Sequence, residues 1–228
     1  MRDAANPNRP ALLLFDINQT LLDLAPLQAS IRAILPGADS PKLWFTTMLQ
    51  HAMAMSLAGR HAPLPEIGTA VLCMLAAGKG IELAPAQAAA ALRPITRLPA
   101  HPDVAPALAR LRAAGVRMAA LSNSTTAGLR AQLDYAGIAR YFDAAFSVDE
   151  VGVYKPHARV YLEAVRRMRV TPGQAMLVAA HGWDTAGAGW AGLQTAFVAR
   201  DGERPFPLAD RPTLDVADLG ELADRLGA

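Results

Sequence analysis

The sequence lacks residues on which several protein classes depend. Cys73 is the only cysteine, so an intramolecular disulfide is impossible and a cysteine-rich metal site is excluded. It lies in the apolar run VLCML, which favours a buried and unreactive thiol. Charged residues make up only 18% of the chain and leave a net charge of +2, so there is no strongly basic surface for nucleic acid. We therefore expect no nucleic-acid partner.

Long apolar runs are absent as well. No run approaches the roughly 20 residues that a membrane-spanning helix needs, and the first ten residues, MRDAANPNRP, are polar. We expect a cytoplasmic protein with no membrane partner. Apolar material is nevertheless plentiful, because hydrophobic residues form 52% of the 228-residue chain. That is enough for one packed domain, or for a core with a modest insertion.

Four short and continuous apolar runs have the character of strands that are covered on both faces. They are residues 11–15, 116–121, 176–180 and 195–199. Amphipathic helical patterns lie between them, at residues 104–114, 126–135, 159–168 and 185–191. The alternation of strand and helix predicts an α/β fold with a doubly wound parallel sheet.

The segment from residue 22 to residue 98 interrupts this alternation. It carries alanine-rich helical patterns at residues 44–57, 66–77 and 85–92 and no convincing strand. We interpret residues 22–98 as a helical cap domain that is inserted into a core formed by residues 1–21 and 99–228. The alanine- and methionine-rich stretch at residues 48–57 could serve a homodimer interface.

Polar residues stand where three of the predicted strands end. Asp16 ends the first run, Ser122 and Asn123 end the second, and the turn from His181 to Asp184 follows the third. Ligands of doubly wound sheets bind beyond the carboxyl ends of the strands. Each of these residues also has an ordinary explanation as a turn or helix cap. Their convergence on one sheet edge is the first functional signal.

Lys155 precedes Pro156 and a predicted helix, where a solvated loop residue is the ordinary interpretation. If its side chain points inward, however, its charge lowers the pKa of Asp16 and keeps that carboxylate ionised. His181 at the mouth of its turn is ordinarily a structural hydrogen-bonding residue.

These sites together resemble a known family. FDxNxT, then LSN, then YKP before a helix, then WD after a strand follow the order of motifs in the haloacid dehalogenase-like (HAD) hydrolases, and most closely in the type II 2-haloacid dehalogenases. The resemblance implies a Rossmann-like core with an inserted cap, and it implies that Asp16 is the covalent nucleophile. It places Thr20 in support of the nucleophile loop, Lys155 at the nucleophile's charge and Asp184 in the fourth motif.

The phosphatase branch of this family carries a second Asp two residues after the nucleophile, as a general acid. Asn18 stands there, and an amide cannot donate and regain a proton at neutral pH. Dehalogenation needs no such acid, because halide leaves without a proton. The implied reaction is attack by Asp16 on the halogen-bearing carbon of a short 2-haloalkanoic acid, a small-molecule carboxylate. Water held near Lys155 and Asp184, with His181 as one candidate partner, then hydrolyses the aspartyl ester to the 2-hydroxy acid.

The resemblance also implies which residues bind substrate, and that no cofactor or metal is required. If Mg²⁺ does bind, Asp16 and Asp184 would be its oxygen ligands. Ser122 and Asn123 are placed at the substrate anion, and Tyr161 matches a tyrosine of the branch. The complete set of expected substrate-binding residues is Ser122, Asn123, Asn18, Ile17, Phe45, Arg60, Tyr161, His181 and Trp183.

The sequence departs from the type II pattern on both sides of the expected pocket. Ile17 stands where an aromatic residue is usual, and Phe45 stands where an arginine of the cap meets the substrate carboxylate. Ala179 and His181 replace a serine and an asparagine. Arg60 is the cap arginine that could substitute for the missing one, although an exposed side chain is its ordinary interpretation.

Two other functions remain open at this stage. One is a different hydrolase of the same fold, such as an Mg²⁺-dependent phosphatase, against which Asn18 argues. The other is a binding or regulatory protein that has kept the fold and lost turnover, which the altered pocket residues Phe45, Ala179 and His181 leave open.

Overall fold

A computed structural model describes residues 10–228 and shows an α/β fold around one six-stranded sheet. All of its strand pairs are parallel, in the order β3-β2-β1-β4-β5-β6. The strands are β1 (Leu12–Phe15), β2 (Met118–Ser122), β3 (Ala144–Ser147), β4 (Ala175–Ala179), β5 (Gln194–Val198) and β6 (Leu214–Val216). The predicted fold class is confirmed. Residues 1–9 of the predicted core lie outside the described residues.

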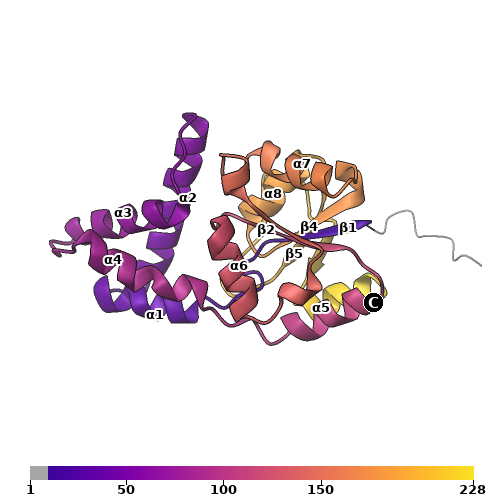
Figure 1. The fold of residues 1–228 in the computed structure, drawn as a ribbon, viewed down its shortest axis with the longest axis horizontal. Coiled ribbons are helices and arrows are strands. Elements are labelled where there is room, and N and C mark those ends of the chain that lie inside the picture. Colours follow the sequence, from indigo (N-terminus) through magenta and orange to yellow (C-terminus); the bar gives the residue numbers. More distant parts are fainter. Residues whose placement is uncertain (1–9) are drawn as a thin grey trace, which may run out of the picture.

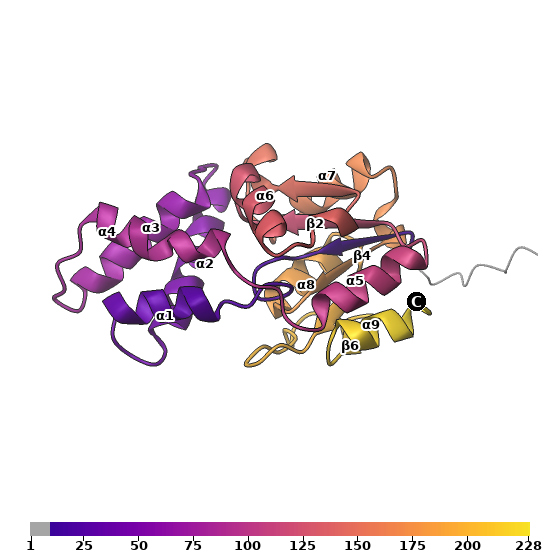
Figure 2. The ribbon, with the colours of Figure 1, turned by 60° about the horizontal axis from the view of Figure 1, so that its bottom comes forward.

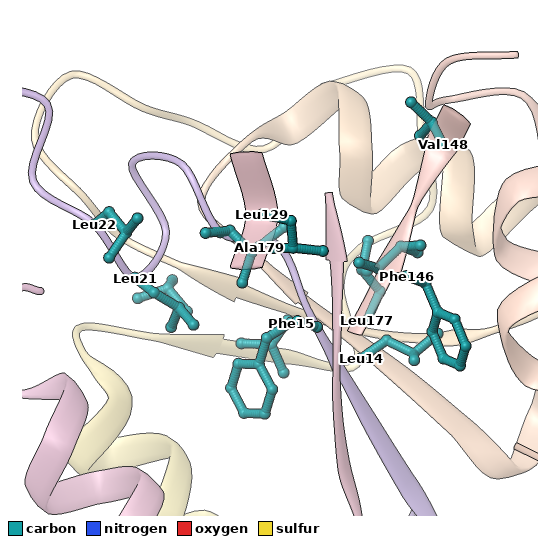
Figure 3. Close-up of a cluster of buried hydrophobic side chains, with 14 of the residues drawn as sticks. Leu14, Phe15, Leu21, Leu22, Leu129, Phe146, Val148, Leu177 and Ala179 are labelled. Atoms are coloured by element: carbon teal, nitrogen blue, oxygen red, sulfur yellow. The ribbon is translucent and has the colours of Figure 1, made fainter. Parts of the chain in front are cut away.

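The sheet is apolar because helices cover both of its faces. Figure 1 shows α7 (Ala158–Arg167) and α8 (Gly182–Trp190) on one face, and α5 (Val104–Ala113) with α9 (Leu219–Arg225) on the other. α6 (Thr126–Tyr135) packs beside β3. The side chains of Leu14, Phe15 and Leu177 lie in the buried cluster that joins these layers (Figure 3).

The strand order places a crevice next to β1. The chain passes from β1 to β2 and β3 on one side, and then returns to β4 on the other side of β1. Ligands of doubly wound sheets bind at this switch point, beyond the carboxyl ends of the strands. Phe15 pairs with Val178, so Asp16 and the turn after β4 emerge side by side.

Four helices follow β1 before the chain reaches α5. They are α1 (Ala25–Ile34), α2 (Ser40–Leu57), α3 (Leu64–Ala77) and α4 (Pro85–Leu92), and we call them the cap helices. Figures 1 and 2 both show them gathered at one end of the molecule, apart from the sheet. A short 3-10 turn, η1 (Arg93–Thr96), leads from α4 back towards the core. The boundaries at residues 22 and 98 stay a prediction.

The end of α2 makes a second connection to the core. The backbone N–H of Tyr154 donates to Ser56 Oγ at 2.9 Å, and the Tyr154 hydroxyl donates to the Ala62 carbonyl at 2.5 Å. The ring of His61 stacks on Tyr154, with 5.3 Å between ring centroids. The α2–α3 loop is therefore attached to the chain directly before Lys155.

Two expectations about apolar segments have different outcomes. Within residues 10–228, none of the helices combines the length and the apolar character needed to cross a membrane. Cys73, in contrast, is partly exposed rather than buried, and this corrects the interpretation of VLCML. α3 buries Ile67, Val71 and Leu72, and at about 100° per residue Cys73 is turned to the edge of that face.

Candidate active site

Asp16 stands at the carboxyl end of β1, where its N–H donates to the Val178 carbonyl at 3.0 Å. A tight turn follows, in which Leu21 N–H donates to the Ile17 carbonyl at 2.9 Å. This turn brings Thr20 back onto the carboxylate, and Thr20 Oγ1 donates to Asp16 Oδ2 at 2.6 Å. The same hydroxyl accepts the N–H of Ala180 at 2.9 Å and so ties the loop after β1 to the loop after β4.

Lys155 lies between two carboxylates. Its Nζ donates to Asp16 Oδ1 at 2.8 Å, to Asp184 Oδ2 at 2.6 Å and to the Leu121 carbonyl at 3.2 Å. All three ammonium protons thus have acceptors. The remaining oxygen of Asp184, Oδ1, accepts the Tyr161 hydroxyl at 2.5 Å. A buried ion pair is stable only when its groups are hydrogen-bonded in this way.

These contacts set the charge of Asp16. Burial raises the pKa of Asp16, but the positive charge of Lys155 and the neighbouring His181 outweigh burial and hold that pKa well below its ordinary range. Burial lowers the pKa of Lys155, and the two carboxylates more than reverse that effect. Burial raises the pKa of Asp184, with Lys155 opposing it. Asp16 is therefore the carboxylate that is held ionised.

The same arrangement bears on Mg²⁺ binding. Lys155 Nζ bonds one oxygen each of Asp16 and Asp184, and Tyr161 bonds another. The described residues also contain no group of three or more His, Cys, Asp or Glu side chains arranged around a common point. Because an ammonium occupies the position between the two carboxylates, these residues do not fit a divalent ion.

Close packing of α8 makes this cluster possible. A Cβ added to Gly187 would overlap the Pro156 ring and lie 3.0 Å from the Tyr161 hydroxyl. Gly187 therefore lets α8 approach the Lys155–Pro156 turn and α7. Asp184, one turn earlier on α8, reaches both Lys155 and Tyr161 as a result.

An aromatic stack stands beside the cluster, where the cap helices meet the core. The His181 ring lies between Phe45 of α2, at 5.7 Å between centroids, and Trp183 of α8, at 5.3 Å. His181 is buried, and its Nδ1 lies 3.3 Å from Asp16 Oδ2. Phe45, which replaces the expected arginine, thus contributes an apolar wall next to the nucleophile.

Asp16 opens into a cavity of about 950 Å³ between the cap helices and the core. Most of its wall is apolar and comes from α2, α3, α4 and η1. Polar groups concentrate at its core end, where Asn18, Asn123 and Ser124 line it. Two exposed arginines, Arg93 and Arg97, line the cavity at η1. Such a cavity suits an organic acid with an apolar body.

The structure sorts the substrate-binding residues expected from the sequence into two groups. Those that line the cavity are Asn18, Phe45, Asn123, His181 and Trp183. Ile17 and Tyr161 are buried away from it, and the Ser122 hydroxyl accepts the N–H of Ser124 at 3.1 Å. These three residues pack or hydrogen-bond beneath the cavity wall and do not line the cavity.

The structure does not bring Arg60 to the cavity. Arg60 is exposed and does not line the cavity, and the loop that carries it is attached to the buried Tyr154. Arg93 and Arg97 are the arginines that the cavity does contain. Both follow the last cap helix, within the segment 22–98 that the sequence assigned to the cap domain without giving either arginine a role.

Sequence reasoning also missed residues that hold the loops in place. Arg200 donates to the Thr20 carbonyl at 3.0 Å from Nη2 and pairs with both oxygens of Asp103 at 2.9 Å. Gln132 donates to Asn18 Oδ1 at 2.7 Å. Arg200 lies two residues after β5, so the rule about strand ends could have found it. Gln132 lies within a helix and offers no such signal.

Comparison with known proteins agrees with this geometry. A model of haloacid dehalogenase-like hydrolases matches residues 10–192. (S)-2-haloacid dehalogenase 1 of Pseudomonas sp. (strain CBS-3) is 31% identical, covering 82% of this chain and 83% of its own. (S)-2-haloacid dehalogenase H-109 of Pseudomonas putida is 29% identical, covering 94% and 96%.

Solved structures give the same result. The L-2-haloacid dehalogenase from Xanthobacter autotrophicus with chloropropionic acid covalently bound superposes with a TM-score of 0.88 at 27% identity, covering 96% of this chain and 99% of that one. The putative HAD-hydrolase YfnB from Bacillus subtilis, bound to magnesium, shares the fold at 20% identity and a TM-score of 0.76. The chain therefore belongs to the haloacid dehalogenase-like hydrolase family, and within it resembles the 2-haloacid dehalogenases over most of its length.

Proposed function

We propose that this protein is a hydrolytic dehalogenase of 2-haloalkanoic acids that works through an aspartyl ester at Asp16. The observation that carries the proposal is an ionised carboxylate, held by Thr20 and Lys155, at the end of a largely apolar cavity. Relatives named as (S)-2-haloacid dehalogenases support it, as does the related structure with covalently bound chloropropionic acid.

The first step is a displacement at carbon. An oxygen of Asp16 forms a bond to the halogen-bearing carbon, and halide leaves with the electron pair of the broken bond. No proton donor is needed. Asn18, at the position of a phosphatase acid, donates to Ser124 Oγ at 3.3 Å and accepts from Gln132 at 2.7 Å. Its role is to join the nucleophile loop to α6, which argues against phosphate-ester chemistry.

The substrate carboxylate has two sets of candidate partners in the cavity. Asn123 Oδ1 accepts the backbone N–H of Lys155 at 3.1 Å, which leaves its amide N–H₂ for a ligand. Near it, the start of α6 lines the cavity, and helix N-termini favour anions. Arg93 and Arg97 offer positive charge on the η1 side. We assign to the guanidinium groups of these two residues the role that the sequence had given to Arg60, which is to bind the substrate carboxylate.

In the second step, water attacks the carbonyl carbon of the ester. The bond between that carbon and the substrate oxygen breaks, one proton of the water goes to the hydroxyl group of the 2-hydroxy acid, and the other is released to solvent as the Asp16 carboxylate is restored. Lys155 supplies the positive charge beside the reacting carboxyl group throughout, and Asp184 and Tyr161 hold Lys155 in position. The reaction as proposed uses no cofactor.

The experiment is a set of parallel assays with purified protein. Halide release from 2-chloropropionate is measured with and without EDTA, and p-nitrophenyl phosphate hydrolysis is measured with Mg²⁺. We expect halide release that EDTA leaves unchanged and that Asp16→Asn abolishes. A single turnover in H₂¹⁸O should place the label in Asp16. Mg²⁺-dependent phosphate release without halide release would overturn the proposal.

Two sequence-based expectations are carried forward as proposals. The cytoplasmic location rests on the sequence alone. A homodimer through the cap helices is supported by exposed apolar side chains on α2 and α3, namely Leu43, Leu57 and Met74 at 45%, 91% and 46% exposure. Light scattering of wild type and Leu57→Lys tests the dimer, and an unchanged mass would count against this interface.

A further inference from the structure

His181 is the least ordinary group near the nucleophile, because the family pattern has an asparagine there. Its Nδ1 lies 3.3 Å from Asp16 Oδ2, and its Nε2 lies 3.2 Å from Oε1 of Gln19. Nδ1 is buried and has no hydrogen-bond partner of good geometry within residues 10–228. A buried ring nitrogen directed at the reacting carboxylate without a hydrogen bond is available to a reactant.

The contacts of Gln19 fix which nitrogen of His181 carries the proton. Gln19 Nε2 donates to Glu203 Oε1 at 3.1 Å, and an ionised carboxylate can only accept. The other end of the amide, Oε1, therefore faces His181 and must accept from Nε2–H. The neutral imidazole then has its lone pair on Nδ1, on the side of Asp16.

Gln19 is held in this position at some conformational cost. Its φ is +67°, in the left-handed region that few residues other than glycine, asparagine and aspartate adopt readily. The Gln19 carbonyl bonds the ring of His101 at 3.0 Å, which stabilises the turn. Strained residues of this kind gather at functional sites, where the surrounding structure enforces them.

We propose that His181 Nδ1 is the general base that activates water in the hydrolysis of the Asp16 ester, with Gln19 and Glu203 as positioning residues. The inference rests on the proposed dehalogenase function and identifies the proton acceptor that this function requires. His181 removes one proton from water as the oxygen of that water bonds to the ester carbonyl carbon. The same proton then passes to the substrate oxygen as the ester bond breaks. The second proton of that water leaves the Asp16 carboxyl group through His181 to solvent, so that the Asp16 carboxylate and the neutral imidazole are both regenerated.

The charges around His181 explain why the ring can act as a base after the ester has formed and not before. Before reaction, the ionised carboxylate of Asp16 lies 3.3 Å from His181 Nδ1, and Lys155 pairs with both Asp16 and Asp184. Burial lowers the pKa of His181, and Asp16, Glu203 and Asp184 raise it above its ordinary value. Ester formation removes the charge of Asp16, the group that faces Nδ1. The pKa of His181 then falls, and the ring becomes a neutral base at the stage when water must be activated.

Two cavities meet at His181, one containing Asp16 on the side of Nδ1 and one containing Gln19 on the side of Nε2. The larger one holds Asp16, and a second one of about 610 Å³ is bordered by Gln19 and Glu203. The stack of Phe45, His181 and Trp183 lines both cavities. Substrate in the first cavity therefore leaves the side of Gln19 and Glu203 accessible.

The test separates ester formation from ester hydrolysis. His181→Phe keeps a ring between Phe45 and Trp183 and removes both nitrogens. With 2-chloropropionate we expect one equivalent of halide to be released rapidly, followed by turnover about 10²–10⁴-fold slower than wild type. Mass spectrometry of the intact protein should show the ester on Asp16, which wild type does not accumulate. His181→Gln provides a second variant if the phenylalanine variant folds poorly.

The positioning residues are tested by pH. Glu203→Gln removes the charge that orients Gln19, so ester hydrolysis should slow and its pH midpoint should move to lower pH. Glu82→Gln, on an exposed residue of the α3–α4 loop, is the matched control and should change neither. Ester hydrolysis at the wild-type rate in both His181 variants would overturn the role of His181 and leave the proposed function intact. A wild-type protein that releases no halide and forms no ester would overturn the proposed function and this inference with it.

Discussion

The two walls of the cavity are built on different physical principles. On the core side, Asp16, Lys155 and Asp184 are buried charges whose polar atoms are bonded to one another at fixed distances. On the cap side, the wall is apolar. Among the described residues, Arg93 and Arg97 are its only charged side chains, and both are exposed. A substitution on the core side disturbs several bonded charges at once, whereas a substitution on the cap side changes one contact and leaves the others in place.

Under the proposed function, this difference assigns the two halves of catalysis to two regions. Buried and preorganised charges act on the reacting atoms, where displacement by a fraction of an ångström matters. Apolar contacts and peripheral charges select the body and the carboxylate of the substrate. Substitutions on the core side should therefore affect stability and turnover together, and substitutions on the cap side should affect mainly KM.

Lys155→Met should give the largest effect. It leaves Asp16 and Asp184 buried without a cation, and breaking a buried ion pair in this way costs about 3–5 kcal/mol. Urea unfolding at pH 7 measures the loss of stability, and the halide assay should show no turnover. A loss below about 1 kcal/mol would show that the core wall is not the rigid element described here.

The pH dependence of this loss follows from the pKa of Asp16. That pKa is lowered in the folded protein, so its stabilising contribution is present above the ordinary value of 3.8 and is lost as the pH falls below it. The difference between wild type and Lys155→Met should therefore narrow in acid. Arg166→Met, which breaks an exposed pair with Glu163, is the control and should leave stability unchanged at every pH.

Gly187→Ala should give the next largest effect. The added methyl group overlaps Pro156 and pushes α8 away from Lys155, and overpacking of this kind costs about 1–3 kcal/mol. Turnover should fall as well, because Asp184 moves with α8. Gly173→Ala is the matched control, since a Cβ there meets no atom within 4 Å. Equal unfolding midpoints for the two variants would contradict the role of close packing.

How much of this could be read from the sequence differs between the two walls. Continuous apolar runs predicted β1, β2, β4 and β5 to within two residues, and the helices at 126–135 and 85–92 match α6 and α4. β3 and β6 were missed because they are short edge strands, with four and three residues and polar neighbours. Their pairing depends on the sheet already being in place.

The site shows the same division. Asp16 and Asp184 could be brought together from the sequence, because strand ends in a parallel sheet share one edge. Lys155 was placed beside them only by the family resemblance. The position of Arg60 could not be predicted, since it depends on how the α2–α3 loop docks on Tyr154. Gln19 gave no signal either, because its role arises from a left-handed backbone and a partner 184 residues away. Residues on regular elements were accessible to sequence reasoning, and loop contacts over long separations were not.

On the cap side, Arg93→Gln with Arg97→Gln should raise KM for 2-chloropropionate about tenfold, equivalent to about 1.4 kcal/mol, with kcat little changed. The reason is that both residues act on the bound carboxylate and not on the reacting carbon. Arg60→Gln removes the same charge outside the cavity and should leave KM unchanged. If Arg60→Gln raises KM and the double variant does not, the cap loop moves onto the substrate and the assignment is reversed.

The smallest effect per step should come from the apolar wall itself. A cavity of about 950 Å³ has room beyond a three-carbon acid, so each added methylene of a 2-chloroalkanoate should gain about 0.8 kcal/mol, roughly fourfold in kcat/KM. The series from 2-chloropropionate to 2-chlorohexanoate measures this gain.

Ala89 lines the cavity but is exposed on α4, so Ala89→Phe fills space without displacing packed atoms. In that variant the gain with chain length should disappear while turnover of 2-chloropropionate persists, because the core wall is untouched. Loss of turnover for every substrate would mean that the cap wall also positions the reacting carbon.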